Sequence, residues 1–231
     1  MLRENIDAKL EAKEIIIADI ALIFAFTMTL DGGIEGMANA SSFISHFIYL
    51  LPIVALGVTL SFILHELMHK FVAEHFGAVA AFRSSTMGLM ITVATGFFGF
   101  LLGIPGATMI YTNRFTKHEE GIVSIAGPLT NFAVFAFFLA LLILSGVQRG
   151  SYLYNAFSFT IFISILLAFF NMLPIPPLDG SKVLAWNKNA YMISMGIIFV
   201  LMFLFTGIPI TSIIFMIFIA LMFSMFYRNV L

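Results

Sequence analysis

Long apolar segments separated by short polar stretches run through most of the chain. Six such segments can be distinguished, at 15–30, 46–76, 119–146, 151–173, 190–206 and 208–227. Most are roughly 20 residues long, which is the length of α-helix that crosses the hydrocarbon core of a bilayer. They lack the alternation of apolar and polar residues that is typical of membrane β-strands. The pattern therefore predicts an all-α polytopic membrane protein with six transmembrane helices.

The segment 78–112 departs from this pattern. Between Thr86 and Gly99 it mixes Thr, Val, Ile and Phe with glycine, a composition that favours strand over helix. Glycine and proline interrupt the residues that follow, at 103–106. Non-helical backbone at membrane depth is tolerated only where protein or a wet cavity covers it. We therefore expect a small sheet, β-hairpin or re-entrant segment here, with a plain cytoplasmic loop as the alternative.

The overall composition supports a protein embedded in a lipid bilayer. Hydrophobic residues make up 61% of the 231 residues and charged residues 10%, whereas soluble domains are about 45–50% apolar and about 25% charged. The net charge of −1 gives no indication of a nucleic-acid partner. The chain has no cysteine, so a metal site would have to use His, Asp or Glu as ligands.

The distribution of Lys and Arg predicts how the chain is oriented in a cell membrane. If the N-terminus is cytoplasmic, ten of the eleven basic residues fall on the cytoplasmic side and only Arg149 falls outside. With six spans, both termini are then cytoplasmic. A cleaved signal peptide is the alternative for the first segment. Its start is acidic as well as basic, however, and the sequence Ala-Asn-Ala at 38–40 lies far beyond the apolar run, so we interpret 15–30 as a retained span.

A cluster of ionisable residues follows an uncharged stretch of the second segment. Residues 65–69 read HELMH. Ionisable residues are costly inside a bilayer, so such a cluster indicates a functional site. On a helix, His65 and His69 share one face and can bind a single Zn²⁺, and Glu66 can reach a metal-bound water. The alternative is a pair of interfacial histidines, with Glu66 paired to Lys70.

Two histidines leave zinc short of a third protein ligand, and the best candidate is Asp179. This residue lies in the sequence NMLPIPPLDG at 171–180. The three prolines cannot continue a helix. We expect the chain to run extended from about Leu173 and to direct Asp179 at the metal, with Gly180 permitting a sharp turn. Alternatively, this is a helix-terminating loop in which Asp179 caps the next segment.

Three other residues are weaker candidates for the third ligand. His75 has the spacing of a longer zinc motif, but Val72 stands where that motif has a glycine. The helix can therefore continue, and His75 then points about 80° away from His65. Glu119 or Glu120 would complete a different kind of membrane zinc site, but neither lies in a recognisable motif.

The sequences HELMH and NMLPIPPLDG resemble the two signature motifs of the site-2 protease family of intramembrane zinc metalloproteases. GPLTN at 127–131 resembles a further motif of that family. The resemblance covers about 46–180, and six spans are typical of the archaeal-type members. It implies one zinc ion bound by His65, His69 and Asp179. It also implies Glu66 as general base and Asn171 in contact with the substrate or the oxyanion.

The resemblance further implies a zinc-dependent endopeptidase that cleaves transmembrane helices of single-span membrane proteins near the cytoplasmic face. We expect one protease domain over 1–231 with its catalytic core at about 46–180, and no PDZ or CBS domain is evident. An exposed strand near Thr86–Phe98 could pair with the unwound substrate. The oligomeric state stays open. Two alternatives are a transporter, whose ion pathway also uses intramembrane His, Glu and Asp, and a catalytically inactive family member.

Overall fold

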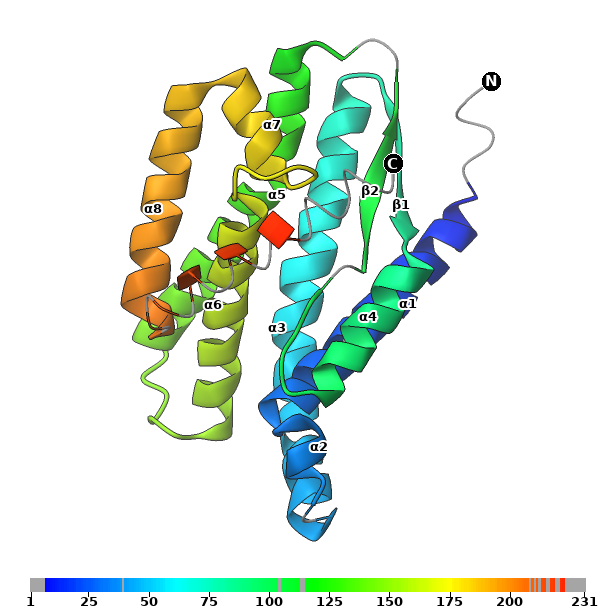
Figure 1. Cartoon of the computed structure of the whole chain (residues 1–231). Helices are drawn as coiled ribbons and strands as arrows, with labels where there is room; N and C mark the ends of the chain where they lie inside the picture. Colours follow the sequence, from blue (N-terminus) through cyan, green and yellow to red (C-terminus); the bar gives the residue numbers. More distant parts are fainter. Residues whose placement is uncertain are drawn as a thin grey trace.

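The computed structural model describes residues 7–38, 40–103, 105–112 and 115–207, and also 209, 211, 213, 214, 217, 218, 221 and 222. The predicted segment 208–227 lies largely outside these residues. The elements are mostly helical and follow one another along the chain as shown in Figure 1. They are α1 (Ala8–Leu30), α2 (Gly33–Gly36), α3 (Ala40–His75), β1 (Val79–Ser84), α4 (Thr86–Phe97), β2 (Gly106–Tyr111), α5 (Lys117–Leu144), α6 (Tyr152–Asn171), α7 (Asp179–Trp186) and α8 (Lys188–Thr206).

Four of the described helices are long and apolar enough to cross a membrane: α3, α5, α6 and α8. They coincide with four of the predicted segments and make the chain a multi-pass membrane protein. Helix α1 covers the predicted first segment, but it carries charged residues along its first half and is not among the four. The predicted count of six spans is therefore not confirmed.

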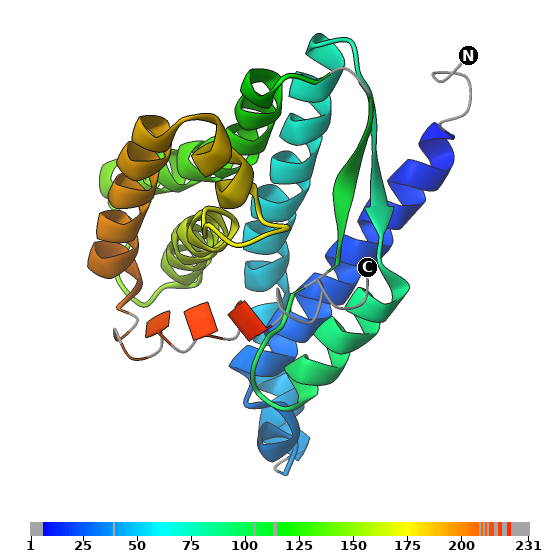
Figure 2. The same cartoon turned by 45° about the horizontal axis from the view of Figure 1, so that its top comes forward.

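Helix α3 occupies the centre of the structure. Figures 1 and 2 show α5, α6, α7 and α8 on one side of it, and α1, α4 and the two strands on the other. One apolar core is formed by α5 to α8 and includes Phe169, Met172 and Val183. A second core joins α1, α3, β1 and the middle of α6, and includes Val58, Phe82 and Ile163. Packing on these two sides buries four polar side chains in the C-terminal half of α3, namely Ser61, His65, Glu66 and His69, whereas its other faces stay exposed.

The segment 78–112 forms an antiparallel pair of strands with a helix between them, so the expected small sheet is confirmed. Phe82 of β1 lies opposite Thr108 of β2. The strand that we predicted between Thr86 and Phe98 is wrong, because those residues form helix α4.

The composition that favoured a strand at α4 has a tertiary explanation. The hydroxyl groups of Thr92 and Thr95 donate to carbonyl groups one turn earlier in the same helix, at 2.8 and 2.9 Å. Gly96 packs directly on α1, where an added Cβ would lie 2.8 Å from the carbonyl oxygen of Ala25. Small residues allow membrane helices to approach closely. The threonine hydroxyls are therefore satisfied within the helix, and the glycine allows α4 to pack against α1.

Two carboxylates of α1 cover the outer edge of the sheet. The backbone N–H of Phe82 donates to Glu11 Oε1 at 3.2 Å, and that of Ser84 donates to Glu14 Oε2 at 3.0 Å. Glu11 is buried and also accepts a hydrogen bond from Lys70 Nζ at 2.5 Å. These contacts tie β1 to α1 and to α3. The outer edge of β2 faces α3 and pairs with no other strand among the described residues; we call it the free edge of β2.

We expect Glu11→Ala to lower the free energy of unfolding by about 1–3 kcal/mol, because it leaves the Lys70 ammonium and the Phe82 N–H without their acceptor. The measurement is thermal denaturation of the purified protein in detergent. Lys13→Ala is the matched control, since Lys13 is exposed on the same helix. Equal stability of the two variants would contradict this role for Glu11.

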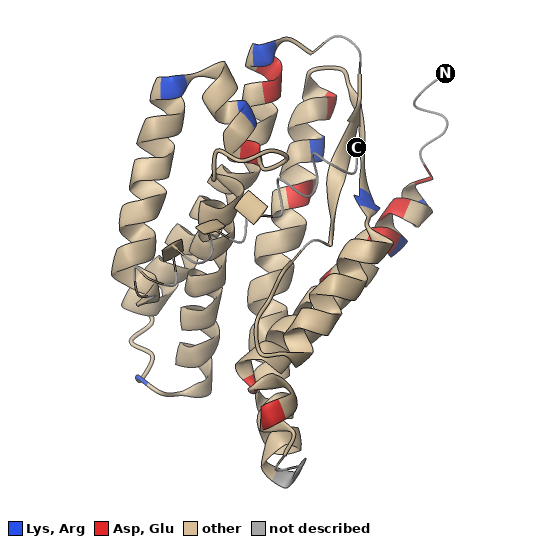
Figure 3. Cartoon of the chain, viewed as in Figure 1, with Lys and Arg blue, Asp and Glu red and all other residues tan. Residues whose placement is uncertain are grey.

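Basic residues are concentrated toward one end of the molecule. Figure 3 shows most described Lys and Arg residues near the end of the bundle that holds α7 and the start of α5. Arg149 belongs to the loop between α5 and α6, and Figure 1 shows that α5 and α6 are joined at the opposite end of the bundle. This arrangement agrees with the rule that basic residues stay on the cytoplasmic side. The orientation of the termini stays a prediction.

Candidate metal centre

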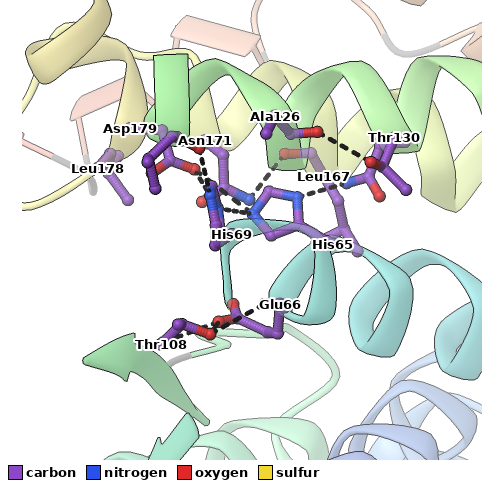
Figure 4. Close-up of polar contacts among 12 residues, drawn as sticks. His65, Glu66, His69, Thr108, Ala126, Thr130, Leu167, Asn171, Leu178 and Asp179 are labelled. Carbon is purple, nitrogen blue, oxygen red and sulfur yellow. Dashed lines mark hydrogen bonds and ion pairs between the residues drawn. The ribbon is translucent and has the colours of Figure 1, made fainter. Parts of the chain in front are cut away.

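The side chains of His65, His69 and Asp179 meet at one point in the protein interior (Figure 4). His65 and His69 lie one turn apart on α3 and are only 4% and 7% exposed. Their Nε2 atoms are 3.0 Å apart. Asp179 Oδ2 lies 3.1 Å from His69 Nε2 and 3.4 Å from His65 Nε2. Among the described residues, this is the one group of His, Asp and Glu side chains arranged to hold a metal ion.

Asp179 reaches this point through a series of turns after α6, and the extended course predicted from Leu173 is wrong. The backbone N–H of Ile175 donates to the carbonyl of Leu173 at 2.8 Å, and the N–H of Leu178 donates to that of Ile175 at 2.9 Å. Leu173 and Ile175 are buried and anchor the turns in the apolar core. Helix α7 then begins at Asp179, so this carboxylate faces α3 from the helix start.

Gly180 has a different purpose from the one we predicted. It lies inside α7 and does not form a turn. A Cβ atom at this position would lie 2.1 Å from the carbonyl oxygen of Met172. Glycine therefore allows the first turn of α7 to pack against the end of α6, and this contact places Asp179 beside the histidines.

The three ligand atoms match the size of a zinc site. Zinc binds His nitrogen and carboxylate oxygen at about 2.0–2.2 Å with tetrahedral geometry, which puts neighbouring ligand atoms about 3.3–3.6 Å apart. The observed separations of 3.0, 3.1 and 3.4 Å are close to that range. Three protein ligands leave the fourth position of such a site to water or substrate, as in catalytic zinc sites.

Helix α5 borders the site with a glycine. A Cβ atom at Gly127 would lie 2.4 Å from His69 Nε2 and 2.6 Å from His65 Nε2. No side chain fits there beside the imidazoles, so the space next to the ligand nitrogens depends on glycine at 127. Gly127 begins the GPLTN sequence, which resembled a family motif but had no assigned role.

Helix α5 also contacts the far side of both imidazole rings. His69 Nδ1 lies 2.8 Å from the carbonyl oxygen of Val123, so the Nδ1–H donates there and Nε2 is left with a lone pair for a metal. His65 Nδ1 lies 3.2 Å from the amide nitrogen of Asn131. The sequence offered no signal for Val123, whose backbone carbonyl makes the contact. Asn131 was within a motif but could not be paired with His65.

The ionisation of Asp179 suits a metal ligand. Burial raises the pKa of Asp179, but when the imidazoles carry protons on Nε2, with no metal bound, the positive charge of His69 and hydrogen bonds from both imidazoles outweigh this effect and hold the pKa well below its usual range. The side chain is therefore a carboxylate at neutral pH. A ligating Asp must be deprotonated, so no proton has to be removed from Asp179 when a metal binds.

Glu66 lies apart from the three ligand atoms. Figure 4 shows its carboxylate on the side of α3 that faces β2. Glu66 Oε2 accepts hydrogen bonds from the backbone N–H and the hydroxyl of Thr108, each at 2.8 Å. The sequence gave no reason to connect Thr108 with Glu66, because the contact depends on how the sheet packs against α3. Glu66 therefore lies between the histidines and the edge of β2.

Asn171 and the weaker ligand candidates have other contacts. The amide of Asn171 donates to the carbonyl of Leu167 in its own helix at 3.0 Å. His75 is exposed at the end of α3, and Glu120 is exposed at the start of α5. Glu119 closes a capping box at the start of α5 and accepts from the Thr116 N–H and hydroxyl. None of these three candidates belongs to the group formed by His65, His69 and Asp179.

Comparisons with known proteins identify the family. The model of peptidase family M50 matches residues 147–205, which include Asn171 and Asp179. A protein of Methanocaldococcus jannaschii named "Putative zinc metalloprotease MJ0611" is 43% identical over 145 residues, covering 62% of this chain and 73% of that protein. The chain belongs to peptidase family M50. The resemblance to site-2 proteases is thereby confirmed, and this M50 peptidase is a metalloendopeptidase with zinc as its cofactor.

Two further relatives of this M50 peptidase carry similar names. "Putative zinc metalloprotease YwhC" of Bacillus subtilis is 33% identical over 159 residues, covering 62% of this chain and 72% of that protein. "Putative zinc metalloprotease Rip2" of Mycobacterium tuberculosis is 31% identical over 140 residues, covering 54% and 52% of the two chains. No solved structure gives a significant match.

Proposed function

We propose that this M50 peptidase is an intramembrane endopeptidase that cleaves the transmembrane helices of single-span membrane proteins near the cytoplasmic face. The observation that supports this most directly is the close approach of His65, His69 and Asp179, which lie within 3.4 Å of one another at their ligand atoms. Two of these ligands lie on a helix that is apolar enough to cross a membrane. A zinc site on such a helix suits a substrate that is itself in the bilayer.

In this proposal, His65, His69 and Asp179 hold the zinc, and two other residues act on the substrate. A zinc ion held by these three residues would supply Lewis-acid activation of water and of the scissile carbonyl. Glu66 takes the proton of the attacking water and passes it to the leaving amine. The amide of Asn171 releases the Leu167 carbonyl and donates a hydrogen bond to the developing oxyanion.

We propose that the substrate pairs with the free edge of β2. The segment 86–98, which the sequence suggested for this pairing, forms helix α4 and offers no strand edge. A peptide bond in a transmembrane helix is shielded by its own hydrogen bonds, so the substrate must unwind before cleavage. An unwound segment can add to an exposed strand edge through its backbone groups. The N–H of Thr108 points from this edge to Glu66. A substrate strand that competes for this N–H would lie next to the proposed base.

The extent and orientation of the catalytic unit are also proposals. The core at about 46–180 contains all the proposed ligands, the base and Asn171 within one protease domain over 1–231. Both termini are proposed to be cytoplasmic, in agreement with the positions of the basic residues. The metal centre would then lie near the cytoplasmic ends of α3 and α6, where the path for water is short.

The proposal is tested by incubating the purified, zinc-loaded protein in lipid vesicles with a panel of single-span peptides and locating the cuts by mass spectrometry. We expect cleavage toward the cytoplasmic third of the span, loss of cleavage with a zinc chelator, and recovery when zinc is restored. His65→Ala should be inactive, and His75→Ala serves as the control on the same helix. Cleavage that survives in His65→Ala, or no cleavage of any peptide by the wild type, would contradict the proposal.

Substrates with weakened helices should be cleaved faster. An Asn-Gly pair reduces the cost of opening a helix by roughly 1–2 kcal/mol, which corresponds to about fivefold to thirtyfold in the open population. The measurement is a competition between two matched single-span substrates. One has an Asn-Gly pair near the expected cut, and the other has Leu-Leu at those positions. Equal rates for the two would show that unwinding does not limit cleavage.

A further inference from the structure

We infer that Asn131 is a positioning residue for the metal centre: its side-chain oxygen accepts a hydrogen bond from His65 Nδ1–H and so holds His65 Nε2 ready for zinc. This inference rests on the proposed role of His65 as a zinc ligand. It concerns a buried amide on α5 that does not itself contact the metal or the substrate.

The surroundings of Asn131 single it out. Its side chain is completely buried, one helical turn beyond Gly127 on α5. The amide nitrogen lies 3.2 Å from His65 Nδ1. Its oxygen, Oδ1, is buried and has no hydrogen-bond partner in the part of the chain that the structure describes. Buried polar atoms are nearly always hydrogen-bonded, so an unpartnered oxygen in contact with a metal-site histidine requires an explanation.

The tautomer of His65 provides that explanation. His65 Nε2 faces His69 and Asp179, so zinc binding needs a lone pair on Nε2 and the ring hydrogen on Nδ1. An Nδ1–H facing the amide nitrogen of Asn131 would bring two donors together. Rotating the amide by half a turn exchanges its oxygen and nitrogen, which have nearly the same shape. Oδ1 then accepts from Nδ1–H, and the amide NH₂ takes the buried position at which Oδ1 had no partner, so the close contact of two donors is removed.

The two histidines are therefore held in different ways. The Nδ1–H of His69 donates to the backbone carbonyl of Val123, which no substitution removes. His65 depends on the side chain of Asn131. An acceptor behind a metal-binding histidine fixes the orientation of the ring and makes it a better ligand, and its loss costs about 10–100-fold in metal affinity or activity. Asn131 is thus the partner that mutation can test.

The experiment measures the zinc affinity of the purified full-length protein by competition with a chromophoric chelator. Asn131→Leu keeps the approximate size of the side chain and removes the acceptor, so we expect zinc affinity to fall about 10–100-fold. Asn131→Asp supplies a carboxylate acceptor and should keep affinity near the wild-type value. Thr130→Val is the matched control on α5, because the Thr130 hydroxyl donates to the Ala126 carbonyl in its own helix at 2.9 Å and does not contact His65.

A structural role alone predicts a different pattern. If Asn131 served only to pack helices, Asn131→Asp would bind zinc as weakly as Asn131→Leu, and that result would overturn the inference. If Asn131→Leu does not fold, Asn131→Asp alone decides, and a more than tenfold loss of its zinc affinity would overturn it. As a second readout, the visible absorption of the Co²⁺-substituted protein should change in Asn131→Leu and stay as in the wild type in Asn131→Asp and Thr130→Val.

His65→Ala separates this inference from the proposed function. Loss of zinc in His65→Ala with unchanged zinc affinity in Asn131→Leu would overturn the role of Asn131 and leave the proposed ligands in place. Wild-type zinc affinity in His65→Ala would overturn the ligand set, and the inference would fail with it.

Discussion

We expect Glu66→Gln to lower the rate of proteolysis about 10²–10⁴-fold while leaving zinc bound, which is the effect of removing a general base. Glutamine has the shape of glutamate, and its side-chain oxygen can still accept a hydrogen bond from Thr108, which donates to Glu66 at 2.8 Å. The fold and the zinc ligands should therefore be kept. The measurements are the initial rate of cleavage of a single-span substrate and the zinc content per chain.

Two comparisons sharpen this prediction. Glu74→Gln makes the same chemical change at an exposed position of α3 and should have no effect on cleavage. Thr108→Val removes one of the two hydrogen bonds to Glu66 Oε2 and keeps the other, which comes from the backbone, so a smaller loss of rate is expected. Near wild-type cleavage by Glu66→Gln would show that another group is the base. Loss of zinc in that variant would instead indicate that Glu66 supports metal binding.

Gly127→Ala should lower zinc affinity by more than about 100-fold, beyond the usual effect of changing a residue behind a ligand. The added methyl group would lie 2.4 Å from His69 Nε2 and 2.6 Å from His65 Nε2, closer than non-bonded atoms can approach. The imidazoles would have to move apart, and the ligand set would open. Cleavage should be lost together with zinc, and chelator competition measures the first effect.

Gly196→Ala is the control for the glycine substitution. Gly196 lies in α8, and nothing lies within 4 Å of an added Cβ there. Alanine is a better helix former than glycine by about 0.8–1 kcal/mol, so both variants gain intrinsic helix stability, and helix propensity cannot explain a loss of zinc in Gly127→Ala. Full zinc affinity in Gly127→Ala would show that α5 is further from the imidazoles than the structure places it.

The helices that form the bundle were predictable because their signal is local. Continuous apolar runs predicted α3, α5, α6 and α8, since a helix that crosses a bilayer must be apolar along its whole length. Helix α4 was not predictable. By composition its Thr92 favours a strand and its Gly96 disfavours a helix, yet they serve hydrogen bonding within the helix and packing against Ala25 of α1, respectively. A short segment with mixed composition takes its conformation from its neighbours, and those are not adjacent in the sequence.

The course of the chain before Asp179 shows the same limit. The prolines correctly predicted that α6 ends near Asn171, because proline cannot continue a helix. They did not predict the turns that follow or the use of Gly180 to pack α7 against Met172. Proline restricts the backbone locally, whereas the path of a loop depends on the core into which its apolar side chains fit.

The sequence by itself determined the type of site: a cysteine-free membrane protein with two histidines one helical turn apart and a carboxylate after a proline-rich break. Helical spacing and ligand chemistry are properties of single segments, so they could be recognised before any contact was known. Only the tertiary structure decided that Asp179 lies beside the histidines. It also showed that Gly127 and Asn131 border the imidazoles and that Thr108 binds Glu66. These contacts join residues that are far apart in the sequence, and they exist because α5, α7 and β2 all pack around the C-terminal half of α3.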